Sequence, residues 1–202
     1  MSIALIGASG NAGSRILKEL SDRGHQVTAI ARHPEKIAQL PGVTPVKGDA
    51  NDEAALASLL RGHDTVISAV HFTASDASVL IGAVKTAGAK RYLVVGGAGS
   101  LEAAPGVALV DTPDFPQAYK AEALAGAEFL DLLRKEPTLD WTFLSPSAMF
   151  VPGERTGKFR LGTDQLLTNE HGSSISFEDY AIALVDEIEK PAHSRQRFTV
   201  GY

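Results

Sequence analysis

The sequence predicts an α/β fold: a doubly wound parallel sheet with helices on both faces and a small irregular C-terminal lobe. Two observations support this prediction. Short runs rich in Val and Ile alternate with helix-like stretches, and a glycine-rich turn joins the first run to the first stretch. Strands that alternate with helices form βαβ units, whose crossovers place helices on both faces of a parallel sheet.

The individual elements follow from length and spacing. Apolar runs bounded by turn residues predict strands over 2–6, 26–31, 43–47, 64–70 and 91–95. Apolar residues at helical spacing predict helices over 11–22, 52–61 and 76–87, with a short turn around 34–39. Farther along, we expect a helix over 119–135, a strand over 141–145, a helix from Ser176 to about Lys190 and a strand over 197–202. Ser176 and Asp179 have the spacing of a capping box, which favours a helix start there.

Two segments lack this rhythm. Residues 97–118 contain three Pro and three Gly without clear periodicity, which is long for a plain connection. Residues 146–175 are also irregular, and we expect a small hairpin within the stretch SPSAMFVPGERTGKFRLG. Because no repeat or linker is visible, the chain is predicted to form a single domain over 1–202, with a core over 1–145 and a C-terminal, substrate-side segment over 146–202.

Composition narrows the function classes. The chain has 202 residues, of which 44% are hydrophobic, so it can bury a sizeable core. With 19 Lys and Arg against 24 Asp and Glu, the net charge of −5 argues against nucleic-acid binding. The absence of Cys excludes disulfides, thiolate metal sites and a Cys nucleophile.

The sequence also indicates where the protein works. The first residues, MSIALIGASGNAG, lack a basic region and a long apolar run, so we expect a cytoplasmic protein without a membrane partner. The six His residues are scattered, and no metal site is expected. No GxSxG or GxxxxGK[ST] motif is present, which argues against the usual hydrolases and P-loop proteins.

The strongest functional signal is the turn GASGNAG, which contains Gly7, Gly10 and Gly13. Small residues there let the chain turn sharply, approach a pyrophosphate and pack the helix on the sheet. The helix N-terminus offers free N–H groups and partial positive charge to phosphates. Ser9 and Asn11 can add donors. The core is therefore predicted to be a Rossmann-like dinucleotide-binding domain.

Several segments carry a resemblance that spans nearly the whole chain. These are GASGNAG, RYLVVGGAGSL, LDWTFLSPSAMF with PGERTG, and ISFEDYAIALVDEIE with RQRFTVGY. Together they resemble the atypical short-chain dehydrogenase/reductase superfamily, specifically the NmrA-like NAD(P)H-binding proteins and the NADH-flavin reductase group. The resemblance implies a Rossmann-type fold, a nicotinamide cofactor and an activity that is assigned to the group only provisionally. Superfamily members often dimerise, so it also allows a homodimer, although no stretch marks an interface.

The end of the second strand predicts which cofactor is preferred. An acid about 20 residues beyond the glycines would bind the ribose of NAD. Here the strand is followed by Arg32 and His33, with no acid until Glu35. Arg32 can pair with a 2′-phosphate, which favours NADP(H) over NAD(H); the alternative is an ordinary surface Arg.

Further residues are candidates because of their place in the fold. In similar proteins an Asp placed like Asp49 bonds the adenine, but Asp49 could equally cap the helix that follows, as could Asn51 or Asp52. Ala69 and Val70 end the fourth strand, where ligands bind in such sheets. Pro146, with Ser147, would face the nicotinamide by similarity.

The catalytic residue is harder to predict. The superfamily's carbonyl chemistry uses a Tyr, a Lys four residues later and an upstream Ser. Tyr119 stands at the start of the long helix, but position 123 is Ala and Lys120 lies on another side of the helix. Ser100 is equally explained by a glycine-rich turn. Tyr119 and His71 remain weak catalytic candidates, and a loop His with an ordinary structural partner is the more common case.

Hydride transfer to a flavin tolerates the missing Tyr–Lys pair, because the isoalloxazine ring is already electrophilic and needs mainly orientation. The sequence therefore favours an NAD(P)H-dependent reductase acting on FMN, FAD or a similar planar small molecule such as a quinone. Alternatives are a non-catalytic NADP(H) sensor and, less favoured, a sugar epimerase or dehydratase.

The irregular segments also contain residues that could line a pocket for the acceptor. Apolar walls could come from Phe115, Met149, Phe150 and Phe159, although packing in the core explains these residues as well. A basic cluster could come from Arg155, Lys158 and Arg160, although a solvated hairpin face explains it as well.

Overall fold

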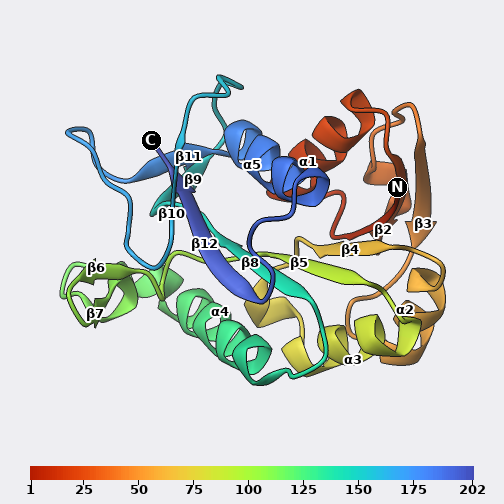
Figure 1. Ribbon diagram of the computed structural model, residues 1–202, viewed down its shortest axis with the longest axis horizontal. Helices are drawn as coiled ribbons and strands as arrows, with labels where there is room; N and C mark the ends of the chain where they lie inside the picture. Colours follow the sequence, from red (N-terminus) through yellow and green to blue (C-terminus); the bar gives the residue numbers. More distant parts are fainter.

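A computed structural model describes all residues, 1–202, and contains a central sheet of eight strands flanked by helices (Figure 1). The core strands are β1 (Ser2–Ile6), β2 (Gln26–Ala31), β3 (Val43–Lys47), β4 (Thr65–Ser68), β5 (Arg91–Val95), β8 (Trp141–Ser145), β10 (Arg160–Gly162) and β12 (Gln196–Gly201). The α-helices are α1 (Asn11–Asp22), α2 (Glu53–Leu60), α3 (Ala77–Ala87), α4 (Gln117–Lys135) and α5 (Phe177–Glu189). Short 3-10 turns cover Pro34–Lys36, Phe72–Ala74 and Leu109–Asp111.

The strand order is β10-β12-β8-β5-β4-β1-β2-β3, and every pair is parallel except β10 with β12. The order reverses between β1 and β4, where Ile6 lies opposite Ile30 of β2 on one side and Ser68 of β4 on the other. In open parallel sheets, ligands bind at such a reversal, beyond the carboxyl ends of the strands. The predicted doubly wound α/β fold is confirmed.

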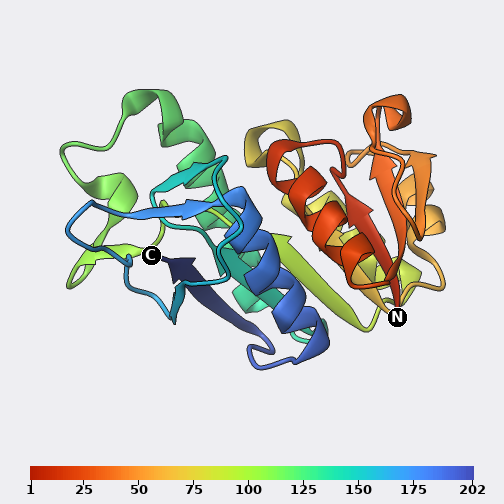
Figure 2. The ribbon, with the colours of Figure 1, turned by 90° about the horizontal axis from the view of Figure 1, so that it is seen from above.

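Two cores fill the space on either side of the sheet. On one face, α1 and α5 lie side by side and bury residues such as Ile16, Leu20 and Leu184 against the strands (Figure 2). On the other face, α2, α3 and α4 bury Leu56, Val84 and further apolar residues (Figure 1). Because both faces are covered, the central strands are almost continuously apolar, which is why the sequence shows unbroken Val and Ile runs there.

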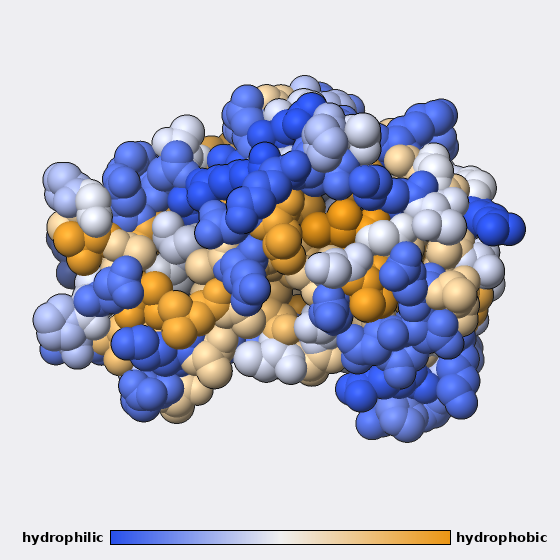
Figure 3. Space-filling view, turned by 90° about the horizontal axis from the view of Figure 1, so that it is seen from below, coloured by the Kyte–Doolittle hydropathy of each residue, from blue (hydrophilic) through white to orange (hydrophobic).

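The outer side of the α2–α4 layer is mostly polar, with apolar side chains gathered in patches between the charged groups (Figure 3). Leu124, exposed on α4, is one of the large apolar side chains left uncovered. None of the helices combines the length and the apolar character needed to cross a bilayer, and no group of three or more His, Asp or Glu side chains is placed to hold a metal ion.

The two irregular segments contain more pairing than predicted. Within 97–118, β6 (Glu102–Ala104) and β7 (Val107–Ala108) form a hairpin whose turn contains Gly106 at φ 75°. The hairpin expected within SPSAMFVPGERTGKFRLG was wrong: β9 (Met149–Val151) pairs in parallel with β11 (Ser174–Ser176), and β10 pairs with β12. These partners lie far apart in the chain, so local turn signals could not reveal them.

Buried polar side chains hold the C-terminal lobe together. Asp179, fully buried on α5, accepts hydrogen bonds from the backbone N–H groups of Thr156 and Gly157, each at 2.8 Å, and from the hydroxyls of Thr156 and Tyr202. Ser176 caps the helix as predicted, since its Oγ accepts from Asp179 N at 3.0 Å, but the reciprocal half of the capping box is not formed, because Ser176 N donates to the Tyr202 hydroxyl instead. One carboxylate thus fixes a loop, a helix start and the C-terminal residue.

Candidate cofactor site

The glycine turn between β1 and α1 is a close-packed cradle. Gly7 has φ +82°, and a Cβ there would collide with the carbonyl of Ala69. A Cβ on Gly13 would likewise collide with the carbonyl of Gly7. The backbone N–H of Gly7 donates to Ile30 at 2.9 Å, which ties the turn to β2. Only glycine fits at positions 7 and 13, as the motif predicted.

The N-terminus of α1 is open to an anion. Its N-cap is Gly10, no side chain caps it, and its first turn contains no acid. The N-termini of α2, α3 and α5 are instead capped by Asp52, Asp76 and Ser176, whereas α4, which begins after Pro116, also has no side-chain cap. Ser9, Gly10 and Asn11 are exposed beside the free N–H groups. A pyrophosphate would satisfy those donors and the helix dipole, so the residues present fit a dinucleotide.

At the end of β2, Arg32 is exposed and forms no hydrogen bond or ion pair within the chain. His33 next to it contacts Glu35 through Nδ1 at 3.1 Å. The structure thus leaves Arg32 available, as a 2′-phosphate ligand would need, and places no acid at the strand end itself.

After β3, Asp49 is exposed, and its carboxylate accepts only from the backbone N–H of Asn51, at 2.9 Å. The cap of α2 is Asp52, whose side chain accepts from Ala55 N at 3.1 Å. Helix capping therefore does not explain Asp49, and the adenine contact stays a prediction.

The end of β4 forms the other wall of the crevice. Ala69 N donates to Ile6 at 2.9 Å, and both Ala69 and Val70 are half-buried directly beside Gly7. Pro146 is buried after β8. Ser147 is fully buried, and its hydroxyl donates to Val200 at 3.0 Å, so the expectation that Ser147 faces the cofactor was wrong.

A carboxylate that the sequence did not single out lies next to His71. Glu122 of α4 accepts from the backbone N–H of Phe72 and Thr73, at 2.8 and 2.9 Å, and from the Thr73 hydroxyl. It also lies 3.3 Å from His71 Nδ1. The available sequence signal was weak: an acid three residues after Tyr119 on a helix that begins beside the strand ends.

The remaining catalytic candidates are less well placed. Tyr119 is 65% exposed, and its hydroxyl has no hydrogen-bond partner. Ser100 Oγ accepts from the buried Arg197 at 3.2 Å, and Arg197 also bonds Asp164. Burial lowers the pKa of Arg197, which Asp164 opposes. Ser100 therefore belongs to a structural network, and position 123, where a catalytic Lys would stand, is an Ala packed against Gly99.

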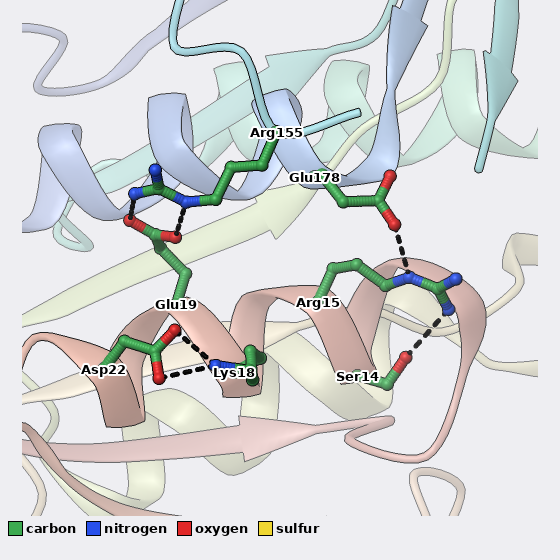
Figure 4. Close-up of a pocket in the computed structure, with 7 residues that line it drawn as sticks. All are labelled: Ser14, Arg15, Lys18, Glu19, Asp22, Arg155 and Glu178. Atoms are coloured by element: carbon green, nitrogen blue, oxygen red, sulfur yellow. Dashed lines mark hydrogen bonds and ion pairs between the residues drawn. The ribbon is translucent and has the colours of Figure 1, made fainter. Parts of the chain in front are cut away.

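The expected basic cluster is dispersed. Arg155 reaches across to Glu19 on α1 with two hydrogen bonds of 2.8 Å, and Arg160 donates to backbone carbonyls of Thr168 and Tyr202. Lys158 is exposed. Figure 4 shows Arg155 and Glu19 beside the pair Arg15–Glu178. These residues line a groove of about 410 Å³ in which Arg155 is already paired with Glu19, so the predicted cluster does not offer three free basic groups.

The apolar wall candidates divide. Phe150 packs against Phe177 and Tyr180, with ring centroids 4.5 and 4.7 Å apart, and Phe159 packs on the same core. These two are structural. Met149 is 58% exposed and Phe115 is half-buried, so both remain available to a ligand.

Comparison with known protein families shows the family to which the chain belongs. A family model described as NAD(P)H-binding matches residues 7–191, which include the cradle, Arg32 and the β4 end. The chain belongs to the NAD(P)H-binding family. The predicted resemblance is thereby confirmed, and the fold is that of an oxidoreductase-like NAD(P)H-binding protein.

Three relatives span the whole chain. The uncharacterised protein YwnB of Bacillus subtilis is 43% identical over 99% of this chain and 98% of its own length. A Bacteroides thetaiotaomicron structure, provisionally described as an epimerase, has TM-score 0.94 and 44% identity over 100% of this chain and 96% of its own. A Streptococcus pneumoniae structure, provisionally described as an NADH-flavin reductase, has TM-score 0.86 and 41% identity over 100% and 99%. The two solved structures have the fold of this chain, but their descriptions name different activities.

Proposed function

We propose that the protein is an NAD(P)H-dependent reductase that passes hydride to a flavin or a similar planar acceptor such as a quinone. The observation that carries this proposal is the open glycine cradle of Gly7, Gly10 and Gly13 at the uncapped start of α1, where the sheet order reverses. The provisional flavin reductase description of the Streptococcus pneumoniae relative supports the choice of acceptor.

NADP(H) is the preferred cofactor in this proposal. The free guanidinium of Arg32 supports it, because a planar fork can bind a 2′-phosphate with two charge-assisted hydrogen bonds. Arg32 and Asp49 would hold the adenosine half of the cofactor and the N-terminus of α1 its pyrophosphate, which would leave the nicotinamide half toward the ends of β4 and β8. Ser9 and Asn11 would supply further donors to the phosphates, and Ala69, Val70 and Pro146 would line the nicotinamide half.

The bound nicotinamide supplies the hydride. The chain itself would orient the cofactor through the cradle and hold the acceptor against the carboxyl ends of the strands. Positioning of this kind can contribute much of a rate enhancement when the acceptor is already electrophilic. No Tyr–Lys pair is required for it, which agrees with Ala at position 123.

A second candidate function is an NADP(H) sensor without turnover. It is favoured by Tyr119, which is exposed and lacks both a Lys partner and a hydrogen bond. A sugar epimerase is less well supported, although one relative is provisionally so described, because epimerases of this superfamily depend on the Tyr–Lys pair that is missing here.

The deciding experiment is a titration of the purified protein with NADPH and with NADH, followed by addition of FMN or a quinone while the nicotinamide absorbance is recorded. Tighter binding of NADPH, with oxidation above the uncatalysed rate, is the expected result. Binding without oxidation by any acceptor would favour the sensor. Absence of binding by either nucleotide would overturn the proposal.

A further inference from the structure

The strongest unexplained feature is the contact between His71 and Glu122. His71 follows β4 by three residues, on the nicotinamide side of the proposed site, and its side chain is 85% exposed. Nδ1 lies 3.3 Å from Glu122 Oε1, while Nε2 has no partner in the chain. The ring therefore has one nitrogen toward a carboxylate and the other toward solvent.

The backbone beneath His71 is held firmly. Phe72 inserts against Phe129 and Phe143, with ring centroids 5.8 and 6.3 Å apart, and lies so close to Gly126 that a Cβ there would come within 2.8 Å of the ring. Glu122 closes the other side through the N–H groups of Phe72 and Thr73. An exposed histidine is thus mounted on a fixed turn instead of a loose loop.

Glu122 is suited to orient the ring. Burial alone would raise the pKa of Glu122, but hydrogen bonds from the Thr73 hydroxyl and from the N–H groups of Thr73 and Phe72 outweigh it and hold the pKa below its usual range. Glu122 is therefore a carboxylate at neutral pH, and it can accept a hydrogen bond from Nδ1–H of His71. A carboxylate that binds one ring nitrogen fixes which nitrogen faces the reaction.

We propose that His71, oriented by Glu122, donates the proton that a neutral acceptor such as a quinone needs when it receives hydride. Glu122 is the positioning residue. This proposal rests on the proposed reductase function. Because the Tyr–Lys pair is missing, the proton donor is otherwise unassigned, and the proposal assigns it to His71. It also narrows the acceptor to planar carbonyl compounds that take up a proton on reduction.

The step balances as follows for a quinone. The C–H bond of the reduced nicotinamide breaks, and its hydrogen and electron pair pass to the quinone, which is reduced while the cofactor is oxidised. The Nε2–H bond of the His71 imidazolium breaks, and its proton forms the second O–H bond of the hydroquinone. The imidazole then takes a proton from water, to which its exposed ring has access.

The test compares two planar acceptors with the NADPH-loaded protein. A neutral naphthoquinone needs one proton on accepting hydride, whereas the N-methylphenazinium cation becomes a neutral product with none. For His71→Gln, the enzyme-dependent quinone rate divided by the phenazinium rate should fall at least about 100-fold, because a positioned general acid typically contributes about 10²- to 10⁴-fold. His171→Gln is the matched control, because His171 is also exposed beside an acid, Glu170, at 3.4 Å, and its ratio should stay unchanged.

A second readout needs no turnover. The ¹⁵N shifts of the His71 ring in the free protein report which nitrogen holds the proton, and in the neutral ring it should be Nδ1. Glu122→Gln should remove that preference and lower the quinone-to-phenazinium ratio. An unchanged ratio in His71→Gln, or a proton on Nε2, would overturn the inference. Failure of the unaltered protein to reduce either acceptor would instead overturn the reductase function.

Discussion

Polar groups differ in their pairing between the cofactor half of the molecule, around β1, α1 and β2, and the C-terminal lobe, residues 146–202. In the cofactor half, the donors at the strand ends are free: the first turn of α1 has no side-chain cap, and Arg32 has no partner. In the C-terminal lobe the corresponding groups are paired, with Asp179 accepting from Thr156, Gly157 and Tyr202, and Arg155 bound to Glu19. Free donors at a strand end indicate ligand binding, whereas charges that are paired within the chain indicate a structural role.

The largest effect that would sharpen this contrast is expected for Gly7→Ala. The new Cβ would meet the Ala69 carbonyl, and φ +82° is strained for any other residue. We expect a loss of at least about 3 kcal/mol in the free energy of unfolding, together with loss of NADPH binding, measured by denaturant titration and calorimetry. Gly24→Ala is the control, because Gly24 has φ +80° with nothing within 4 Å; it should cost about 1 kcal/mol. Equal costs for both variants would refute the cradle.

The next largest effect is expected in the lobe. Asp179→Ala leaves the N–H groups of Thr156 and Gly157 and the Tyr202 hydroxyl without their buried acceptor, so we expect about 3 kcal/mol lower stability. Asp186→Ala on the same helix removes an exposed pairing with Arg23 and should cost less than about 1 kcal/mol. If both variants unfold at the same denaturant concentration, the buried carboxylate of Asp179 makes no net contribution to the free energy of unfolding.

The sequence predicted the features that depend on neighbouring residues and missed those that depend on distant segments. The glycine turn, the capped helices and the core strands are set by neighbours within a few residues, so β1, β2, β3, β5 and β8 were predicted with their observed bounds. The pairing of β9 with β11 and of β10 with β12 joins distant segments, and the local pattern of residues 146–175 favoured a hairpin instead.

The site shows the same limit. Gly7, Gly13 and Arg32 stood out because their roles depend on local backbone geometry and a missing acid. Glu122 did not, because its contact with His71 crosses 51 residues and depends on how α4 packs beside the 3-10 turn at Phe72–Ala74. The hydroxyl of Ser147 likewise turned inward because β12 offered it an acceptor.

A moderate effect is expected for Arg32→Ala, which tests whether a free donor means binding. Loss of a charge-assisted contact to the 2′-phosphate should weaken NADPH binding about 10- to 100-fold and leave NADH within about twofold. Arg61→Ala, another exposed Arg without a partner in the chain, should change neither. Equal weakening of both nucleotides by Arg32→Ala would mean that the side chain contacts something other than the 2′-phosphate.

The smallest effect is expected for Tyr119→Phe. Tyr119 is 65% exposed, its hydroxyl has no partner, and Ala123 stands where a Lys would lower the pKa of a catalytic Tyr. With no group to hold or activate that hydroxyl, its removal should change kcat/KM for NADPH and a quinone by less than about twofold, or about 0.4 kcal/mol. A loss beyond tenfold would restore Tyr119 as an acid–base residue and favour alcohol or sugar chemistry over a planar acceptor. An exposed side chain without a partner therefore need not have a function. Unpaired donors indicate ligand binding only where several of them lie together near the reversal of strand order.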